Sequence, residues 1–131
     1  MKKIMTILIV LLTVSITSCK EAATDGPIKM VTTDEMQQLL ELEDIQLVDV
    51  RTPEEYTGGH IANSQNIDYN SPTFDSEIEK LDKSKPVIIY CKSGGRSAKC
   101  AKKLEDAGFV KIYDLNGGIS EWKHKELAIE I

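Results

Sequence analysis

Short stretches suited to strands alternate with amphipathic segments along most of the chain. The stretches of four or five residues predicted as strands are Ile28–Val31, Gln46–Val50, Ser64–Ile67, Val87–Tyr90 and Val110–Tyr113. The segments predicted as helices are the one that follows Thr32, then Pro53–Tyr56, Phe74–Leu81, Ser97–Ala107 and Gly117–Lys123. Strands that alternate with helices predict an α/β fold, with a central, mainly parallel sheet of five strands and helices on both faces.

Local residues support several of the predicted helix ends. Thr32 and Glu35 have the spacing of a capping box, in which each side chain binds the other's backbone N–H. Pro53 suits the first turn of a helix, where its missing N–H costs no hydrogen bond. Gly108 follows the predicted helix Ser97–Ala107, and glycine commonly ends a helix.

The first residues do not fit this pattern. Met1–Lys3 is basic, and Ile4–Ile16 is an almost unbroken apolar run that is short for a membrane span. Small residues and Cys19 follow, as in a secretory signal. The stretch I-T-S-C resembles a bacterial lipoprotein box, and this resemblance implies that Cys19 is acylated and becomes the new N-terminus. An ordinary signal with an incidental cysteine and a plain membrane anchor are the alternatives.

The chain is thus predicted to have three parts. Residues 1–18 are a lipoprotein signal, 19–27 a small, polar tether that begins with the lipidated cysteine, and 28–131 one folded domain. The expected location is the periplasmic or cell-surface side of a membrane. The membrane is therefore a predicted partner, through the lipid on Cys19.

The net charge limits the class of partner. The full chain carries −5, and loss of Lys2 and Lys3 with the signal takes this to −7. An acidic surface argues against non-specific binding of nucleic acid, which needs a basic face. Any basic site must therefore be local.

Three cysteines are present, and two of them lie in the predicted domain: Cys91 and Cys100. An exported protein can form disulfides. However, a strand end and the third turn of the next helix are unsuited to the Cα separation of below ~7 Å that a disulfide needs. We therefore expect these two cysteines to stay unpaired.

The stretch Tyr90–Ser97, Y-C-K-S-G-G-R-S, carries the candidate chemistry. A cysteine is nucleophilic as the thiolate, and its ordinary pKa of ~8.5 keeps it mostly protonated at neutral pH. Lys92 and Arg96 would favour the anion, and so would the start of the following helix, expected near Ser97. Gly94-Gly95 would let successive N–H groups face one point. The stretch therefore predicts an anion cradle around a reactive Cys91.

Two other interpretations of this loop are open. A strand could end on a buried, inert cysteine before an ordinary turn. Cysteine phosphatases have a similar loop, but they place five residues between the cysteine and the arginine, whereas four separate Cys91 from Arg96. The shorter loop suits one extra sulfur atom better than a tetrahedral phosphate.

Most of residues 30–123 resembles the rhodanese-like sulfurtransferase family, in particular its single-domain members. The segments that carry the resemblance are L-V-D-V-R at Leu47–Arg51, E-E-Y-T-G-G-H-I at Glu54–Ile61, the loop Y-C-K-S-G-G-R-S, the helix R-S-A-K-C-A-K-K-L-E-D-A-G-F after it and L-N-G-G-I-S-E-W near the end. After Ile61 the family usually continues with Pro, Gly and Ala, whereas this chain has Ala62-Asn63-Ser64-Gln65.

The resemblance implies a two-step sulfur transfer. Cys91 would take a sulfur from thiosulfate or a similar small anion, form a persulfide and pass the sulfur to an acceptor, cyanide in the assay or a thiol in the cell. The implied substrate-binding residues are Lys92, Ser93, Gly94, Gly95, Arg96, Ser97 and Arg51, with Asp49 and Glu55 in support. No metal and no organic cofactor are expected.

Several residues have a second interpretation. Asp49 would orient the loop or Arg96, or cap the turn at Pro53. Arg51 would line the mouth of the pocket or lie in solvent. Glu55 would pair with Arg96 or with the backbone, and His60 is expected to be structural. Cys100 is expected to pack within its helix and Trp122 to fill the core.

Two other functions compete with sulfur transfer. A non-catalytic rhodanese-like module would bind partners or sense redox state, although inactive members commonly lack the cysteine that this chain keeps at Cys91. A cysteine phosphatase or arsenate reductase is disfavoured by the four-residue spacing. The sequence does not identify the physiological donor or acceptor.

Overall fold

The computed structural model describes residues 26–42 and 44–131. The predicted signal, 1–18, and the part of the predicted tether that includes Cys19 therefore lie outside the described residues. In the part of the chain that is described, no helix has the length and apolar character needed to cross a membrane.

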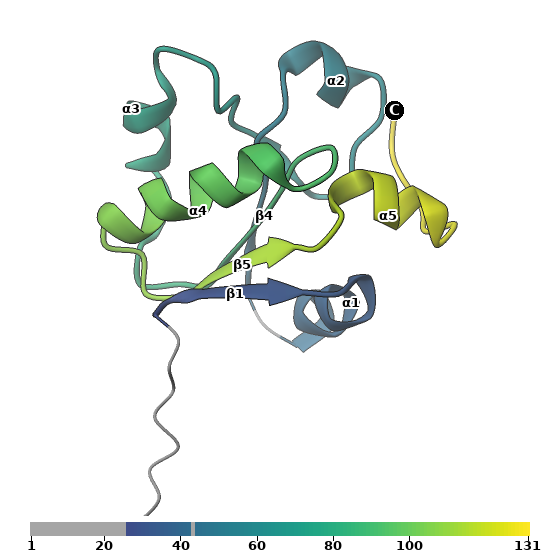
Figure 1. Cartoon of the computed structure of the whole chain (residues 1–131), viewed down its shortest axis with the longest axis horizontal. Helices are drawn as coiled ribbons and strands as arrows, with labels where there is room; N and C mark the ends of the chain where they lie inside the picture. Colours follow the sequence, from purple (N-terminus) through teal and green to yellow (C-terminus); the bar gives the residue numbers. More distant parts are fainter. Residues whose placement is uncertain (1–25, 43) are drawn as a thin grey trace, which may run out of the picture.

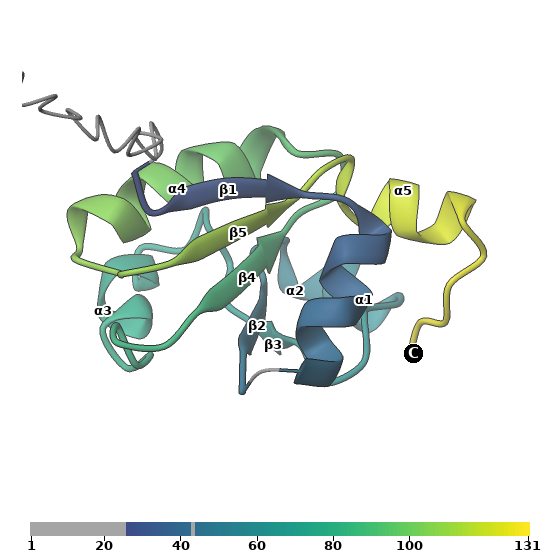
Figure 2. The ribbon, with the colours of Figure 1, turned by 90° about the horizontal axis from the view of Figure 1, so that it is seen from below.

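Five parallel strands form one sheet in this part of the chain, in the order β1-β5-β4-β2-β3. The strands are β1 (Ile28–Val31), β2 (Gln46–Asp49), β3 (Gln65–Asn66), β4 (Val87–Tyr90) and β5 (Ile112–Leu115). The helices are α1 (Thr33–Leu42), α2 (Pro53–Thr57), α3 (Phe74–Ile78), α4 (Gly95–Asp106) and α5 (Gly118–His124). Figure 2 shows the twisted sheet with β1 at its edge. The predicted α/β fold is confirmed.

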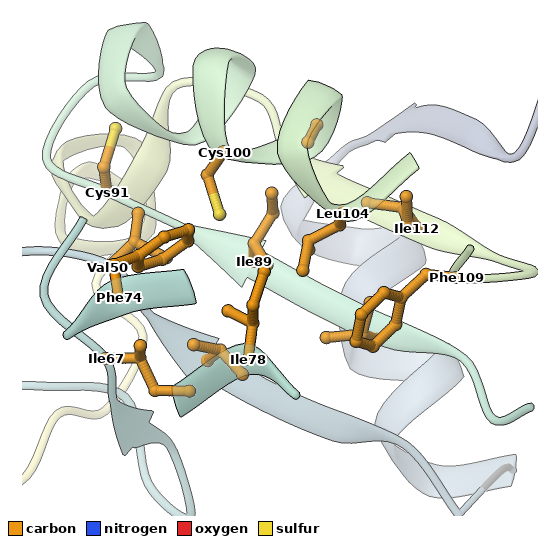
Figure 3. Packing of buried hydrophobic residues seen from close by; sticks show 13 residues of the cluster. Val50, Ile67, Phe74, Ile78, Ile89, Cys91, Cys100, Leu104, Phe109 and Ile112 are labelled. Atoms are coloured by element: carbon orange, nitrogen blue, oxygen red, sulfur yellow. The ribbon is translucent and has the colours of Figure 1, made fainter. Parts of the chain in front are cut away.

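Helices cover both faces of the sheet, and each face has its own apolar core. Figure 1 shows α3 and α4 on one side of the sheet and α1 on the other. Alternate residues of a strand point to opposite faces, so Val87 and Ile89 pack with α3 and α4, whereas Ile88 packs with α1 and α5. Figure 3 shows the first of these cores. The alternation places Cys91, two residues after Ile89, on the α4 side.

The parallel arrangement fixes where a site can form. The chain enters the sheet at Ile28, at the amino ends of the strands. β4 ends one residue before Cys91, which therefore lies at the carboxyl ends of the strands. Loops that follow the carboxyl ends of parallel strands meet along one edge and commonly form the site. The loop after β4 and the segments that follow β2 and β5 therefore converge at the carboxyl ends of the strands.

Several element boundaries differ from those that the sequence predicts, and in three elements the difference is two residues or more. β5 begins at Ile112 rather than Val110, because Ile112 pairs with Val87 while Val110 is 59% exposed. α3 ends at Ile78, and Leu81 lies in the turn that follows. α4 begins at Gly95, two residues before Ser97, so the helix includes part of the cysteine loop.

The predicted capping box at the start of α1 is confirmed. Glu35 N–H donates to Thr32 Oγ1 over 3.1 Å, and Thr32 N–H donates to the Glu35 carboxylate over 3.2 Å. This exchange satisfies backbone donors that a helix start leaves without intrahelical partners.

Candidate active site

Cys91 follows the last residue of β4, and its side chain points toward the start of α4. Figure 3 shows the sulfur atoms of Cys91 and Cys100 pointing in opposite directions, the first toward the loop and the second into the core. Both residues are 1% exposed and both are free thiols, as predicted. Burial disfavours a thiolate unless hydrogen-bond donors replace water, so the surroundings of each sulfur decide its chemistry.

Hydrogen-bond donors of the loop converge on the Cys91 sulfur. The Gly94 N–H donates to Sγ over 3.0 Å, and the Cys91 thiol donates to Ser97 Oγ over 3.5 Å. The Ser97 hydroxyl can donate in the reverse direction once the thiolate forms. Burial by itself raises the pKa of Cys91, but hydrogen bonds from the Ser97 side chain and from the backbone of Ser97, Gly94 and Ser93 outweigh it and lower the pKa. The loop therefore favours the thiolate.

Backbone geometry explains why the loop can do this. Gly94 has φ of 121°, in the region that favours glycine, and the next residue, Gly95, already belongs to α4. Ser97 is fully buried. Its side chain contacts the Cys91 sulfur, and the expected contact of Ser97 with a substrate stays a prediction.

The two cations of the loop contribute less to the thiolate than the sequence suggests. Lys92 is exposed. Arg96 forms a bidentate pair with Glu55, with N–O distances of 2.6 and 2.9 Å. This pair is the main reason why the pKa of Arg96 is raised, and attraction to Cys91 adds to it. Arg96 is therefore near the sulfur, with its charge largely matched by a carboxylate.

Glu55 is the residue of α2 that reaches the loop, and the predicted pair with Arg96 is present. Hydrogen bonding to Arg96 lowers the pKa of Glu55 to about 2, against the opposing effect of burial. Thr52 also binds this carboxylate, at the oxygen that accepts from Arg96 Nη1: its hydroxyl donates to Glu55 Oε1 over 3.2 Å and accepts from the Glu55 N–H over 3.3 Å. Thr52 was not predicted as a site residue, although T-x-x-E at Thr52–Glu55 is a capping-box pattern.

We expect Glu55→Gln to lower the free energy of unfolding by about 1 kcal/mol at neutral pH, since the pair with Arg96 is partly exposed. The pKa of Glu55 is depressed in the folded state, so its contribution is present above the ordinary value of 4.5 and disappears as pH falls toward about 2. Thermal unfolding at several pH values measures this. Glu54→Gln, at an exposed position of the same helix turn, is the control. Equal losses for the two variants would contradict the prediction.

Asp49 and Arg51 bind each other, a pairing that the sequence did not predict for either residue. Arg51 Nη2 lies 2.6 Å from Asp49 Oδ2 and 2.7 Å from the Gly59 carbonyl oxygen. Both residues are buried, so Arg51 lies neither at a pocket mouth nor in solvent. Asp49 does not cap the turn at Pro53, because Thr52 does so. The pair fixes the segment between β2 and α2, and hence the helix that carries Glu55.

The start of α5 holds the cysteine loop from the other side. Ile119 N–H donates to the Cys91 carbonyl over 2.9 Å, and Ser120 N–H donates to the Lys92 carbonyl over 3.0 Å. Gly118 lets the two backbones approach, because a Cβ on it would lie 2.5 Å from the Cys91 oxygen. From the sequence, Gly117-Gly118 was expected to belong to a family motif and to the start of the last helix, with no contact to the loop predicted. These contacts give the glycine pair a direct role in the shape of the loop.

Three further residues have structural surroundings, as predicted. The His60 ring lies 3.0 Å from the Tyr56 carbonyl through Nδ1. Trp122 is buried in the core that α1 and α5 form with the sheet, and it donates to the Ala128 carbonyl over 2.9 Å. Burial raises the pKa of Cys100 to about 12, so this thiol stays protonated.

The site as a whole surrounds one sulfur atom with hydrogen-bond donors and holds the Arg96 guanidinium near it. Within residues 26–42 and 44–131, no three His, Cys, Asp or Glu side chains gather as metal ligands would. The chemistry that these described residues support is nucleophilic attack by the Cys91 sulfur, with Arg96 and the loop amides as the groups nearest to a developing negative charge.

Known proteins resemble this chain over the same region. The family model described as "Rhodanese-like domain" matches residues 32–125. The thiosulfate sulfurtransferase GlpE of Coxiella burnetii is 36% identical over 95 residues, which cover 72% of this chain and 87% of that protein. A sulfurtransferase of Allochromatium vinosum is 33% identical over 93 residues, which cover 71% of this chain and 85% of that protein.

Solved structures give the same picture of the fold. The crystal structure of a rhodanese-like domain protein from Staphylococcus aureus is 35% identical, with a TM-score of 0.67, and the match covers 79% of this chain and 99% of that one. A rhodanese-related protein from Thermoplasma volcanium has a TM-score of 0.70 at 26% identity, over 78% of this chain and 97% of that one.

Proposed function

This chain belongs to the rhodanese-like family of sulfurtransferases, and we propose that it transfers a sulfane sulfur from thiosulfate, or a similar small anion, through a persulfide on Cys91. The observation that carries this proposal is the set of N–H and hydroxyl groups that surrounds the Cys91 sulfur and lowers its pKa. A thiolate held in this way is a nucleophile that needs no separate general base.

The first step is attack of the Cys91 thiolate on the outer sulfur of the donor. For thiosulfate, a bond forms between Sγ and the outer sulfur, and the bond between the two sulfurs of thiosulfate breaks. Its electron pair leaves with sulfite. Charge is conserved, because the thiolate and the thiosulfate dianion become a persulfide anion and the sulfite dianion. The loop amides that lower the pKa of Cys91 are in place to stabilise the persulfide.

The second step returns the enzyme to its starting state. A nucleophilic acceptor, cyanide in the assay or a thiol in the cell, attacks the outer sulfur of the persulfide. Cys91 leaves as the thiolate, which the loop stabilises again. Because the two half-reactions share one covalent intermediate, we expect ping-pong kinetics.

Size and charge support a small anionic donor over the alternatives. Cys91 is 1% exposed, which disfavours attack on a bulky substrate. The four residues between Cys91 and Arg96 leave less room than the five of a cysteine phosphatase. A pure binding module would gain nothing from a thiol with a lowered pKa, so catalysis is the better explanation of this loop.

We expect incubation with thiosulfate to raise the mass of the Cys91 peptide by one sulfur atom, and cyanide to remove it with release of thiocyanate. Intact-peptide mass spectrometry and a thiocyanate assay measure the two steps, and an aryl phosphate serves as the competing substrate. Release of phosphate without thiocyanate would favour a phosphatase. Neither product, with a correctly folded protein, would favour the binding module.

We also propose that Cys19 carries lipid and holds the domain on the exported side of a membrane. The support is the sequence alone: a basic start, the apolar run Ile4–Ile16 and I-T-S-C before the tether. Mass spectrometry of the N-terminal peptide from the producing cells tests this. Acylation at Cys19 is the expected result, and an uncleaved or unmodified N-terminus would contradict it.

A further inference from the structure

The carboxylate of Glu55 places a negative charge beside a loop that is suited to receive an anion. Arg96 lies between Gly94 and Ser97, and these two residues both contact the nucleophilic sulfur. Glu55 holds the Arg96 guanidinium through two N–O contacts, of 2.6 and 2.9 Å. A donor that approaches the sulfur therefore meets an arginine whose charge is already matched by a carboxylate.

Several contacts keep Glu55 in this position. The Thr52 hydroxyl binds both the carboxylate and the N–H of Glu55. Asn66 Nδ2 donates to the carbonyls of Asp49 over 3.0 Å and Arg51 over 2.9 Å, and this fixes the segment that leads from β2 into α2. Glu55 is thus a fixed charge of the site rather than a carboxylate that swings freely in solvent.

The charges close to the sulfur cancel when Cys91 is a thiolate. Glu55 is ionised at neutral pH, because hydrogen bonding to Arg96 lowers its pKa to about 2. Its charge cancels that of Arg96, and the thiolate opposes the charge of the exposed Lys92. The buried ion pair at the end of β2 is neutral as a whole. Within the part of the chain that is described, the site therefore offers hydrogen-bond donors to an anion without a surplus of positive charge.

Such a site distinguishes anions by their charge. Cys91 is 1% exposed, so a donor must give up much of its hydration before its sulfur meets the thiolate. The cost of removing an ion from water rises steeply with its charge, and only a surplus of cations would offset this cost for a dianion. Thiosulfate carries two negative charges, whereas an organic thiosulfonate carries one and presents the same terminal sulfur. A repulsive group is one means by which a site rejects a related ligand.

We propose that Glu55 is a specificity-determining residue, which makes singly charged sulfane-sulfur anions of the organic thiosulfonate class better donors than thiosulfate. The inference rests on the proposed function and names the donor class of the same site. With methanethiosulfonate, the Cys91 thiolate attacks the terminal sulfur, the bond between the two sulfurs of the donor breaks, and its electron pair leaves with methanesulfinate. A thiolate and a singly charged donor become a persulfide anion and a singly charged sulfinate.

The test compares thiosulfate and methanethiosulfonate, two donors of similar shape and different charge, by their kcat/KM with the full chain. Methanethiosulfonate should be the better donor for the parent. Glu55→Gln removes the charge and keeps the shape of the side chain. Loss of one charge acts more strongly on a dianion than on a monoanion, so the ratio of the two kcat/KM values should move toward thiosulfate by about fivefold. The ratio cancels any change in the reactivity of the thiolate itself.

Two further variants separate charge from shape. Glu55→Asp keeps the charge but shortens the side chain, so the donor ratio should stay at the parent's value. Glu54→Gln removes an exposed charge from the same helix turn and should also leave the ratio unchanged. The proposal is overturned by an unchanged ratio in Glu55→Gln, by a parent that prefers thiosulfate, or by an equal shift in either of these control variants.

Arg96→Gln gives a second test that does not depend on the folding of Glu55→Gln. It leaves the Glu55 charge unopposed by its partner, so the donor ratio should move in the opposite direction, away from thiosulfate. A ratio that stays at the parent's value in this variant contradicts the proposal. Thermal unfolding shows whether each variant is folded at the temperature of the assay.

Two unreactive anions test the same preference without sulfur transfer. Sulfate and methanesulfonate match the two donors in charge and approximate shape, and an anion bound beside the sulfur should protect Cys91 from alkylation by iodoacetamide. Peptide mass spectrometry measures the protection, which should improve more for sulfate than for methanesulfonate in Glu55→Gln. Equal changes for the two anions, or no protection, would contradict the proposal. The expected protection without any transfer would count only against the proposed function, and transfer with unchanged donor ratios only against this inference.

Discussion

Replacing Cys91 by serine should lower sulfur transfer by more than about 1,000-fold, because the covalent intermediate can no longer form. The serine hydroxyl can still accept the Gly94 N–H, so the loop has no reason to rearrange. We therefore expect the variant to fold with nearly the parent's unfolding midpoint. Thiocyanate release and the persulfide mass shift measure the loss, and circular dichroism measures the fold.

Cys100→Ala is the matched control for this experiment, since Cys100 is equally buried in the same core. Its high pKa, about 12 because of burial, makes it a poor nucleophile, and it should keep nearly full activity. Residual transfer of more than a few per cent in Cys91→Ser would refute the assignment of the nucleophile. A large loss in Cys100→Ala would instead assign it a role as a second, resolving thiol.

Gly118→Ala should be the most damaging change that leaves every side chain of the site intact. The new Cβ would lie 2.5 Å from the Cys91 oxygen and 2.6 Å from the Lys92 oxygen. Gly118 also has φ of 58°, which an alanine adopts only at a cost. Relief of the clash would break the hydrogen bonds from Ile119 and Ser120 to the loop. We expect a loss of about 3 kcal/mol in unfolding free energy.

Activity should fall further than this loss of stability explains. The N–H groups of α5 bind carbonyls of the cysteine loop, and this holds the N–H groups of the loop toward the Cys91 sulfur. Urea unfolding and the kcat of the folded fraction separate the two effects. Gly58→Ala is the control, since Gly58 has φ of −74° and its Cβ would make ordinary contacts at 3.5 Å. A Gly118→Ala protein with parent-like kcat would mean that the α5 contact does not shape the loop.

The sequence predicted well those features that depend on neighbouring residues. The strand before Cys91, the glycine turn at Gly94 and the capping box at Thr32 are all local patterns, and the structure contains each of them. The order of strands and helices then predicted a parallel sheet with covered faces, because few other arrangements bury such elements. The fold was therefore predictable without any knowledge of side-chain contacts.

Features that depend on distant residues were predicted less well. Glu55 and Arg96 are 41 positions apart, and their pairing was one of two interpretations. Asp49 was expected either to orient the loop or Arg96 or to cap the turn at Pro53, whereas Arg51 binds both of its carboxylate oxygens. Packing between layers, rather than spacing along the chain, decides these contacts.

The chain enters the sheet at Ile28, at the amino ends of the strands, whereas Cys91 lies at their carboxyl ends. This separation matters for a protein that is held on a membrane by lipid. If Cys19 carries lipid, as proposed, the tether would join the domain at the amino ends of the strands. The sulfur-carrying loop lies at the carboxyl ends, so the point of attachment would leave that loop clear for a donor or an acceptor.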